Sequence, residues 1–252
     1  MRSEKVTFMG SQGFDLAARL DRPDGDVEAY ALFAHCFTCG KDLNAINRIS
    51  RALADDGIAL FRFDFTGLGL SSGDFANTNF SSNVEDLLAA ANFMRDTLDA
   101  PSIMIGHSLG GAATLVAAGR VPDIKAVATM GAPFDSTNVL KQFQGDLNTI
   151  EADGEANVML AGKPFTMKQQ FIDDARGQNV ADHIANLKKP LLVMHSPIDD
   201  TVDVEHARKI YETARHPKSF VSLDKADHLL MRNPADGAYV ARILSAWASQ
   251  YL

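Results

Sequence analysis

The stretch Ile103-Met104-Ile105-Gly106-His107-Ser108-Leu109-Gly110-Gly111 is an apolar run that leads into the pattern Gly-x-Ser-x-Gly and then into small residues. This order predicts a strand, a sharp turn and a helix, with Ser108 at the turn. The turn strains the Ser108 backbone and leaves no room for side chains two residues to either side, where Gly106 and Gly110 stand. We expect Ser108 to stand exposed above a sheet, at a helix N-terminus that favours developing negative charge. The position suits a nucleophile, although a capping serine in a glycine-rich turn shares the same five-residue pattern.

The composition is that of an ordinary globular domain. Of the 252 residues, 46% are hydrophobic and 22% are charged, which supplies ample material for one core. The net charge of −8 argues against a nucleic-acid partner and against an anionic membrane surface. Residues 1–10 contain no apolar signal core, and no run approaches the roughly 18 apolar residues of a membrane helix. We therefore expect a single cytoplasmic domain that spans residues 1–252.

Strand-like and helix-like segments alternate along the chain, which predicts a mostly parallel central sheet with helices on both faces. An edge hairpin is expected at 4–9 and 15–21. Ser82 and Glu85 form a capping-box pattern that predicts the start of a helix. Beside the quoted stretch, further strands are expected at 29–35, 58–64, 124–130, 190–195 and 218–223, and further helices at about 41–56, 203–214 and 235–249.

One segment interrupts this alternation. About 60 residues separate strand 124–130 from strand 190–195, far more than a crossover helix requires. Within them, 158–165 resembles a hairpin, flanked by helices expected at about 136–147 and 168–186. An insertion after the carboxyl end of a strand lies above the place where α/β sheets bind ligands. We therefore predict a small cap insertion at about 135–187.

A serine hydroxyl needs a general base, which the segment after strand 218–223 supplies. An unassisted hydroxyl is a poor nucleophile near neutral pH, so acyl transfer requires a base and a carboxylate that orients it. The strand leads into Asp227-His228, and His228 is the predicted base. His107 adjoins the nucleophile and is expected to point elsewhere. Three other histidines, His183, His206 and His216, are expected on helices or in a turn, without an identifiable carboxylate partner.

The orienting carboxylate is expected in the loop after strand 190–195, where Asp199 and Asp200 stand side by side. The predicted end of this strand is uncertain by at least one residue, and a shift of one residue exchanges the positions of the two aspartates. We prefer Asp199, while Asp200 would be a solvated loop carboxylate or a helix cap. The chain order of nucleophile, acid and base is then Ser, Asp, His.

Two backbone N–H groups are also needed to stabilise the negative oxygen of a tetrahedral intermediate. The Leu109 N–H, next to the nucleophile, is the first candidate. The second is expected in the loop after strand 29–35, where Phe37 is the candidate. The Phe37 side chain would also suit an apolar wall of the substrate pocket.

Over its whole length the chain resembles an α/β-hydrolase. The segments His35-Cys36-Phe37-Thr38-Cys39-Gly40-Lys41-Asp42 and Arg62-Phe63-Asp64-Phe65-Thr66-Gly67-Leu68-Gly69 resemble the hydrolase half of bifunctional hydrolase/OsmC-type proteins. Cys36 departs from the wider superfamily, in which most members have glycine after the histidine, and its side chain would narrow the acyl pocket. The resemblance implies esterase-type hydrolysis with the nucleophile, acid and base at Ser108, Asp199 and His228, and oxyanion donors at Phe37 and Leu109.

Other interpretations compete with hydrolysis. Cys36-x-x-Cys39 between a strand and a helix is also typical of a thioredoxin-like redox pair, which would leave the Ser-Asp-His order unexplained. No second ligand pair accompanies these cysteines at a zinc-site spacing. The glycines at 67, 69 and 73 lack the spacing of a dinucleotide fingerprint. A hydrolase-fold protein that binds a ligand without turnover is the third alternative.

The sequence therefore predicts a serine carboxylesterase that forms an acyl-enzyme from small to medium acyl esters, with thioesters as alternative substrates. It predicts no metal and no cofactor. The expected partner is a small-molecule ester, and no nucleic acid or membrane is expected. The resemblance is compatible with a homodimer and, by analogy only, with a functional link to an OsmC-type protein, since 252 residues leave no room for an OsmC-like half.

Overall fold

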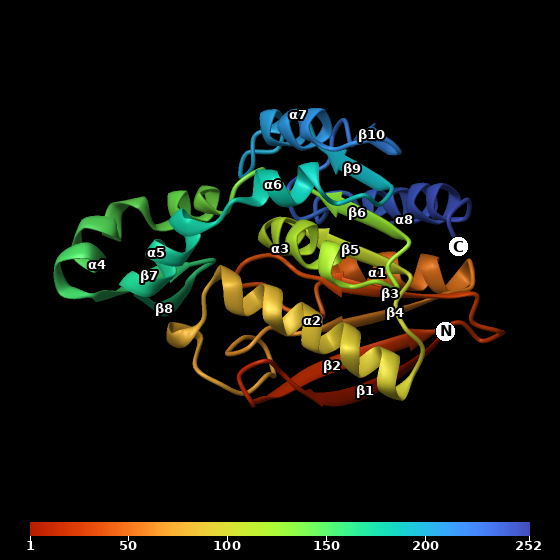
Figure 1. Ribbon diagram of the computed structural model, residues 1–252, viewed down its shortest axis with the longest axis horizontal. Coiled ribbons are helices and arrows are strands. Elements are labelled where there is room, and N and C mark those ends of the chain that lie inside the picture. Colours follow the sequence, from red (N-terminus) through yellow and green to blue (C-terminus); the bar gives the residue numbers. More distant parts are fainter.

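A mainly parallel sheet of eight strands forms the centre of the computed structural model, which describes residues 1–252 (Figure 1). Both pairings of β2 are antiparallel and all others are parallel. The predicted fold class, with helices on both faces of the sheet, is confirmed. In their order across the sheet, the strands are β1 (Arg2–Met9), β2 (Asp15–Arg22), β4 (Ile58–Phe63), β3 (Ala29–Ala34), β5 (Ile103–His107), β6 (Ala126–Met130), β9 (Leu191–His195) and β10 (Lys218–Ser222).

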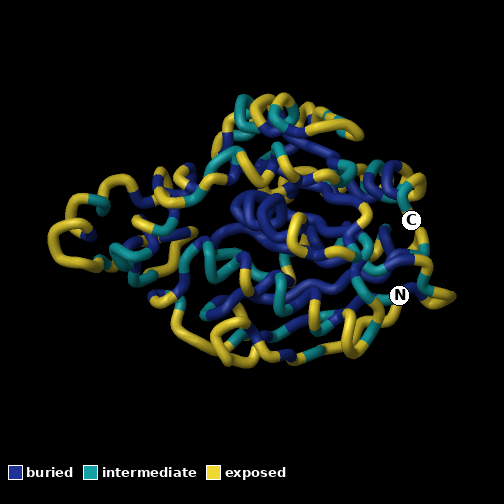
Figure 2. Tube along the Cα trace, in the orientation of Figure 1, coloured by how far each residue is buried: buried dark blue, intermediate teal, exposed yellow.

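The central strands are mostly apolar because both of their faces are covered. Every residue of β4, β5, β6 and β9 is buried, as expected for parallel strands between helices. Burial of each large apolar side chain contributes about 1.5–3 kcal/mol, so these strands dominate the stability of the sheet. The edge strand β1 is mostly exposed instead. Figure 2 shows the same contrast between a buried centre and an exposed periphery.

Two groups of helices cover the two faces of the sheet. One face packs on α1 (Asn44–Asp55) and α8 (Pro234–Ala248), whose buried residues share one core cluster. The other packs on α2 (Phe80–Thr97) and α3 (Leu109–Ala117). The remaining helices outside the insertion are α7 (Val204–Thr213) and the 3₁₀ helices η1 (Phe75–Asn77) and η2 (Ala118–Arg120). No helix combines the length and the apolar character that crossing a membrane requires.

The capping box of α2 differs from the prediction. Asn79 is the N-cap residue, its side chain accepts from the Ser82 N–H at 2.8 Å, and the Ser82 hydroxyl accepts from the Asn79 N–H at 2.9 Å. The expectation that Ser82 caps the helix with Glu85 is wrong, because Asn79 begins the helix one turn earlier. Glu85 instead forms an exposed ion pair with Arg120 at 2.5 Å.

The segment between β6 and β9 extends from the carboxyl edge of the sheet (Figure 1). A hairpin forms there close to its expected position. The single helix expected at 168–186 is wrong, since one helix ends at Gly177 and the Asn179 side chain caps a second one. The helix expected at 136–147 is a 3₁₀ segment with a kink at Phe143. In chain order the elements are η3 (Ser136–Asp146), α4 (Leu147–Asp153), β7 (Glu155–Leu160), β8 (Lys163–Lys168), α5 (Gln169–Gly177) and α6 (Val180–Ala185).

Candidate active site

Ser108 lies at a sharp turn between β5 and α3, with φ 54° and ψ −129°. A non-glycine residue rarely adopts this conformation, so the surrounding structure must hold it. The flanking glycines allow the backbones to approach. A Cβ at Gly106 would lie 2.5 Å from the Gly110 carbonyl oxygen, and one at Gly110 would lie 2.2 Å from the His35 carbonyl oxygen. The local strand-turn-helix pattern is therefore as the sequence predicts.

The structure brings Ser108, His228 and Asp199 together in one line of hydrogen bonds. His228 Nε2 accepts from the Ser108 hydroxyl at 2.9 Å, and His228 Nδ1 donates to Asp199 Oδ2 at 2.7 Å. Asp200 is exposed and lies 4.0 Å from the Arg232 guanidinium. Of the two aspartates that spacing alone left open, Asp199 is the one in contact with His228.

Asp199 is held in its ionised form. Burial by itself raises the pKa of this carboxyl, but the hydrogen bond from His228 and those from two backbone N–H groups outweigh burial and lower the pKa below its ordinary value. The Thr201 and Val202 N–H groups both donate to Asp199 Oδ1 at 2.9 Å. An ionised carboxylate in this position fixes the His228 tautomer and stabilises an imidazolium.

Ser108 is 4% exposed and His228 is 9% exposed, so the expectation of an exposed serine is wrong. The insertion packs on the loop that follows β3. The Phe37 ring of that loop lies 5.5 Å from the Phe171 ring of α5 and 5.8 Å from the Phe75 ring of η1. The insertion thereby contacts the side chain of a residue whose N–H is a predicted oxyanion donor.

The loop after β3 aims the Phe37 N–H. His35 Nδ1 donates to the Cys36 carbonyl at 2.8 Å, His35 Nε2 accepts from the Phe65 N–H at 3.3 Å, and the Cys39 N–H donates to the same Cys36 carbonyl at 3.2 Å. The C=O and N–H of a trans peptide point in opposite directions, so holding the Cys36 carbonyl fixes the direction of the Phe37 N–H. That N–H donates to no group of the protein, although the residue is 7% exposed.

Leu109, the other predicted donor, is the first residue of α3. The first N–H groups of a helix have no partner within the helix, and the helix dipole places partial positive charge there. Leu109 at the start of α3 and Phe37 in the loop after β3 thus both have N–H groups free to bind an anionic oxygen.

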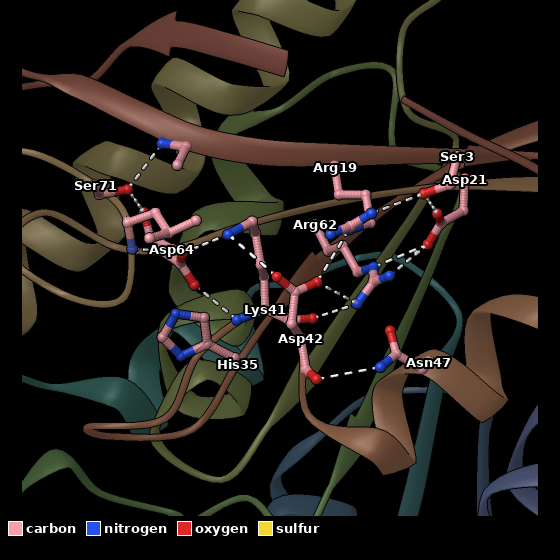
Figure 3. Close-up of polar contacts among 12 residues, drawn as sticks. Ser3, Arg19, Asp21, His35, Lys41, Asp42, Asn47, Arg62, Asp64 and Ser71 are labelled. Carbon is pink, nitrogen blue, oxygen red and sulfur yellow. Dashed lines mark hydrogen bonds and ion pairs between the residues drawn. The ribbon is translucent and has the colours of Figure 1, made fainter. Parts of the chain in front are cut away.

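A buried charge network that the sequence analysis missed anchors the far end of the same loop (Figure 3). Asp64 accepts from the Lys41 ammonium at 2.6 Å and from the Lys41 N–H at 2.7 Å. The Arg62 guanidinium donates to the Lys41 carbonyl at 2.5 Å and to Asp21 at 2.9 Å. Lys41 is therefore held through its side chain, its N–H and its carbonyl. The only signals in the sequence were the segments 35–42 and 62–69, which contain Lys41, Arg62 and Asp64 and pointed to a family resemblance rather than to ion pairs.

Two further histidines support the site from behind. His107 Nε2 lies 2.7 Å from the His228 carbonyl, and His195 Nε2 lies 2.8 Å from the Val202 carbonyl, which fits an N–H donor on each ring. Burial, reinforced by the nearby His228, lowers the pKa of His107 to about 3, so the ring is neutral. His107 points away from the Ser108 hydroxyl as expected, and it holds the backbone of the predicted base.

Comparisons with known proteins place these features in a wider group. The family model described as "Serine aminopeptidase, S33" matches residues 27–153. The crystal structure of the esterase domain from a Rhodothermus marinus protein is 47% identical, covers 100% of this chain and 99% of its own, and superposes with a TM-score of 0.80. Est1E from Butyrivibrio proteoclasticus, with ferulic acid bound, shares the fold at 20% identity and a TM-score of 0.81, covering 98% of this chain and 99% of its own.

A mammalian relative is also similar. The mitochondrial palmitoyl-protein thioesterase ABHD10 of Rattus norvegicus is 26% identical over 204 residues, which are 78% of this chain and 66% of that protein. The resemblance to the α/β-hydrolase superfamily is thus supported, while the narrower resemblance to hydrolase/OsmC proteins stays a prediction.

Proposed function

The chain belongs to the serine aminopeptidase S33 family of α/β-hydrolases, and from this premise we propose that it is a serine carboxylesterase acting on small to medium acyl esters. The observation that supports this most directly is the line of hydrogen bonds from Asp199 through His228 to the Ser108 hydroxyl. An ester is favoured over a peptide because the chain is 47% identical to a protein described as an esterase domain.

The reaction begins with attack of Ser108 Oγ on the acyl carbonyl. His228 Nε2 takes the hydroxyl proton as the bond forms, and Asp199 stabilises the resulting imidazolium. The negative oxygen of the tetrahedral intermediate binds the N–H groups of Leu109 and Phe37, each of which is worth about 10²–10³ in rate. His228 then protonates the leaving alcohol, which departs and leaves an acyl-enzyme.

Water completes the cycle. It loses a proton to His228 as it attacks the acyl carbonyl, and collapse of the second tetrahedral intermediate returns the proton to Ser108 and releases the acid. The mechanism uses no metal and no cofactor, so dialysis against a chelator should leave the rate unchanged. The buried position of Ser108, beside a loop packed against the insertion, favours acyl groups of limited size.

The test is hydrolysis of a series of p-nitrophenyl esters from acetate to octanoate, with a peptide p-nitroanilide and an acyl thioester in parallel. Ser108→Ala should lower kcat by about 10⁴-fold or more, while Ser222→Ala, an exposed serine, serves as the matched control. A fluorophosphonate should label Ser108, located by peptide mass. Full activity in Ser108→Ala would sink the proposal, and a preference for the anilide or the thioester would reassign the substrate class.

A further inference from the structure

The two cysteines of the chain form a disulfide across the turn that carries a predicted oxyanion donor. Cys36 is bonded to Cys39, and the Cys39 N–H donates to the Cys36 carbonyl at 3.2 Å, so the covalent bond and the hydrogen bond close the same four-residue turn. Phe37 is the second residue of this turn. The chain has no other cysteine, and the proposed hydrolysis uses neither sulfur.

The turn includes a strained residue. Thr38 has φ +58°, in the left-handed region that a β-branched residue rarely adopts. Such a conformation persists only where the surrounding structure holds it. Cys36 and Cys39 flank the Phe37-Thr38 pair, so the disulfide holds the two ends of the strained turn at a Cα separation of 5.3 Å. Without the bond, Thr38 is free to relax to negative φ.

Relaxation of Thr38 would move the donor. The Cys36 carbonyl accepts from the His35 ring and from the Cys39 N–H, and the second of these bonds lasts only while the turn stays closed. The same peptide group carries the Phe37 N–H on its opposite side. The disulfide closes a very short loop, and short loops gain the least stability from a cross-link. Its main effect is therefore local: it keeps one N–H group aimed.

We infer that the Cys36–Cys39 disulfide is a thiol–disulfide switch that sets the turnover of the hydrolase through the Phe37 N–H; this rests on the proposed function. The reaction partner is a dithiol. Its first thiolate attacks the sulfur of Cys39, the partly exposed residue of the pair, and Cys36 leaves as a thiolate. The second thiolate of the partner then attacks the partner's first sulfur in the mixed disulfide, and Cys39 leaves as a thiolate. The partner ends as a disulfide, and the protein has gained two electrons, with its thiolates protonated from solvent.

The switch is tested on the intact chain in both redox states. Protein is reduced with dithiothreitol and desalted without oxygen, because free thiols attack p-nitrophenyl esters directly. Intact mass after iodoacetamide counts the free thiols, with none expected before reduction and two after it. A missing donor lowers kcat by about 10²–10³, and a displaced one is expected to lower it by about tenfold or more, with KM little changed. Reoxidation should restore the rate.

Two variants separate the switch from other effects of reduction. Cys36→Ser/Cys39→Ser should give one low kcat that dithiothreitol does not alter. Thr38→Gly should lose far less of its own rate on reduction, since glycine adopts positive φ without strain. A role in packing alone would not produce this rescue.

Each remaining outcome decides the matter. Equal kcat in the oxidised and reduced enzyme, two free thiols in the oxidised preparation, or loss of the far-UV circular dichroism on reduction would each overturn the switch. Absence of Ser108-dependent hydrolysis in the oxidised enzyme would instead overturn the proposed function, and the switch with it. The thiol count from mass distinguishes that failure from the others.

Discussion

The Lys41 ammonium lies 2.6 Å from the Asp64 carboxylate, and the two side chains are 4% and 2% exposed. This buried ion pair joins the end of the loop after β3 to the end of β4, and the loop carries Phe37. Arg62 and Asp21 extend the network beneath it (Figure 3). The position of a predicted oxyanion donor therefore depends on charges that never contact the substrate.

Removal of one charge from this pair should destabilise the fold. Asp64→Asn leaves the buried Lys41 ammonium with only the partly exposed Asp42 carboxylate, at 3.5 Å, as counter-charge, and breaking a buried pair in this way costs about 3–5 kcal/mol. The free energy of unfolding in urea measures the loss. Glu151→Gln, which removes one partner of the half-exposed pair with Arg176, should cost at most about 1 kcal/mol. Equal losses in the two variants would contradict this account.

Substitution of the two adjacent aspartates should have very different effects on kcat. Asp199→Asn removes the carboxylate that orients His228, and we expect kcat to fall by about 10⁴-fold with a small change in KM. Asp200→Asn, one residue away and exposed, should keep the rate within about twofold because it contacts neither His228 nor Ser108. The steady-state constants of both variants on one p-nitrophenyl ester give the answer, and a large loss in Asp200→Asn would reverse the assignment.

The neutral His107 should make the fold sensitive to acid. Its pKa is about 3 in the folded chain and about 6.5 when unfolded, so between these values the unfolded state binds one more proton. Stability is then complete above about pH 6.5 and falls as pH decreases toward 3. His107→Asn should reduce the slope of the unfolding free energy against pH in this window, by up to the contribution of one proton taken up on unfolding. Urea unfolding at pH 4, 5, 6 and 7 measures the slope, and an unchanged slope would refute the prediction.

A methyl group at Gly110 should disrupt the nucleophile turn. The added Cβ of Gly110→Ala would lie 2.2 Å from the His35 carbonyl oxygen, a backbone atom that cannot rotate away. We expect the midpoint of thermal unfolding to drop and kcat to fall, because α3 must move away from the loop after β3. Gly119→Ala provides the control, since its Cβ would meet nothing within 4 Å. That variant should be neutral or slightly stabilised, by up to about 1 kcal/mol.

Local patterns in the sequence identify part of the site and leave the rest hidden. Ser108 follows from a strand-turn-helix pattern nine residues long, and His228 follows from its place after the last strand. Asp199 could not be distinguished from Asp200 by sequence, because a shift of one residue in the predicted end of the preceding strand exchanges their positions. Contacts between distant segments left no periodic signal at all: His107 and the carbonyl of His228 are 121 residues apart, and Lys41 and Asp64 are 23 apart.

The fold shows the same division. Apolar runs predict the central strands because burial on both faces excludes most polar side chains. The burial of Ser108 was not predicted, since it depends on contacts between segments far apart in the chain, of which the packing of Phe37 on Phe171 is an example. The break before Asn179 was missed because the apolar periodicity continues across it. Only the polar side chain of Asn179, which caps the second helix, marks the break.

The last strand to be synthesised, β10, lies at the edge of the sheet beside β9, and the loop after it carries His228. Ser108 meets that imidazole across 120 residues of chain. A growing polypeptide on the ribosome would therefore carry its serine without a base until His228 has emerged, and the onset of the proposed hydrolysis would mark the moment at which this edge of the sheet closes.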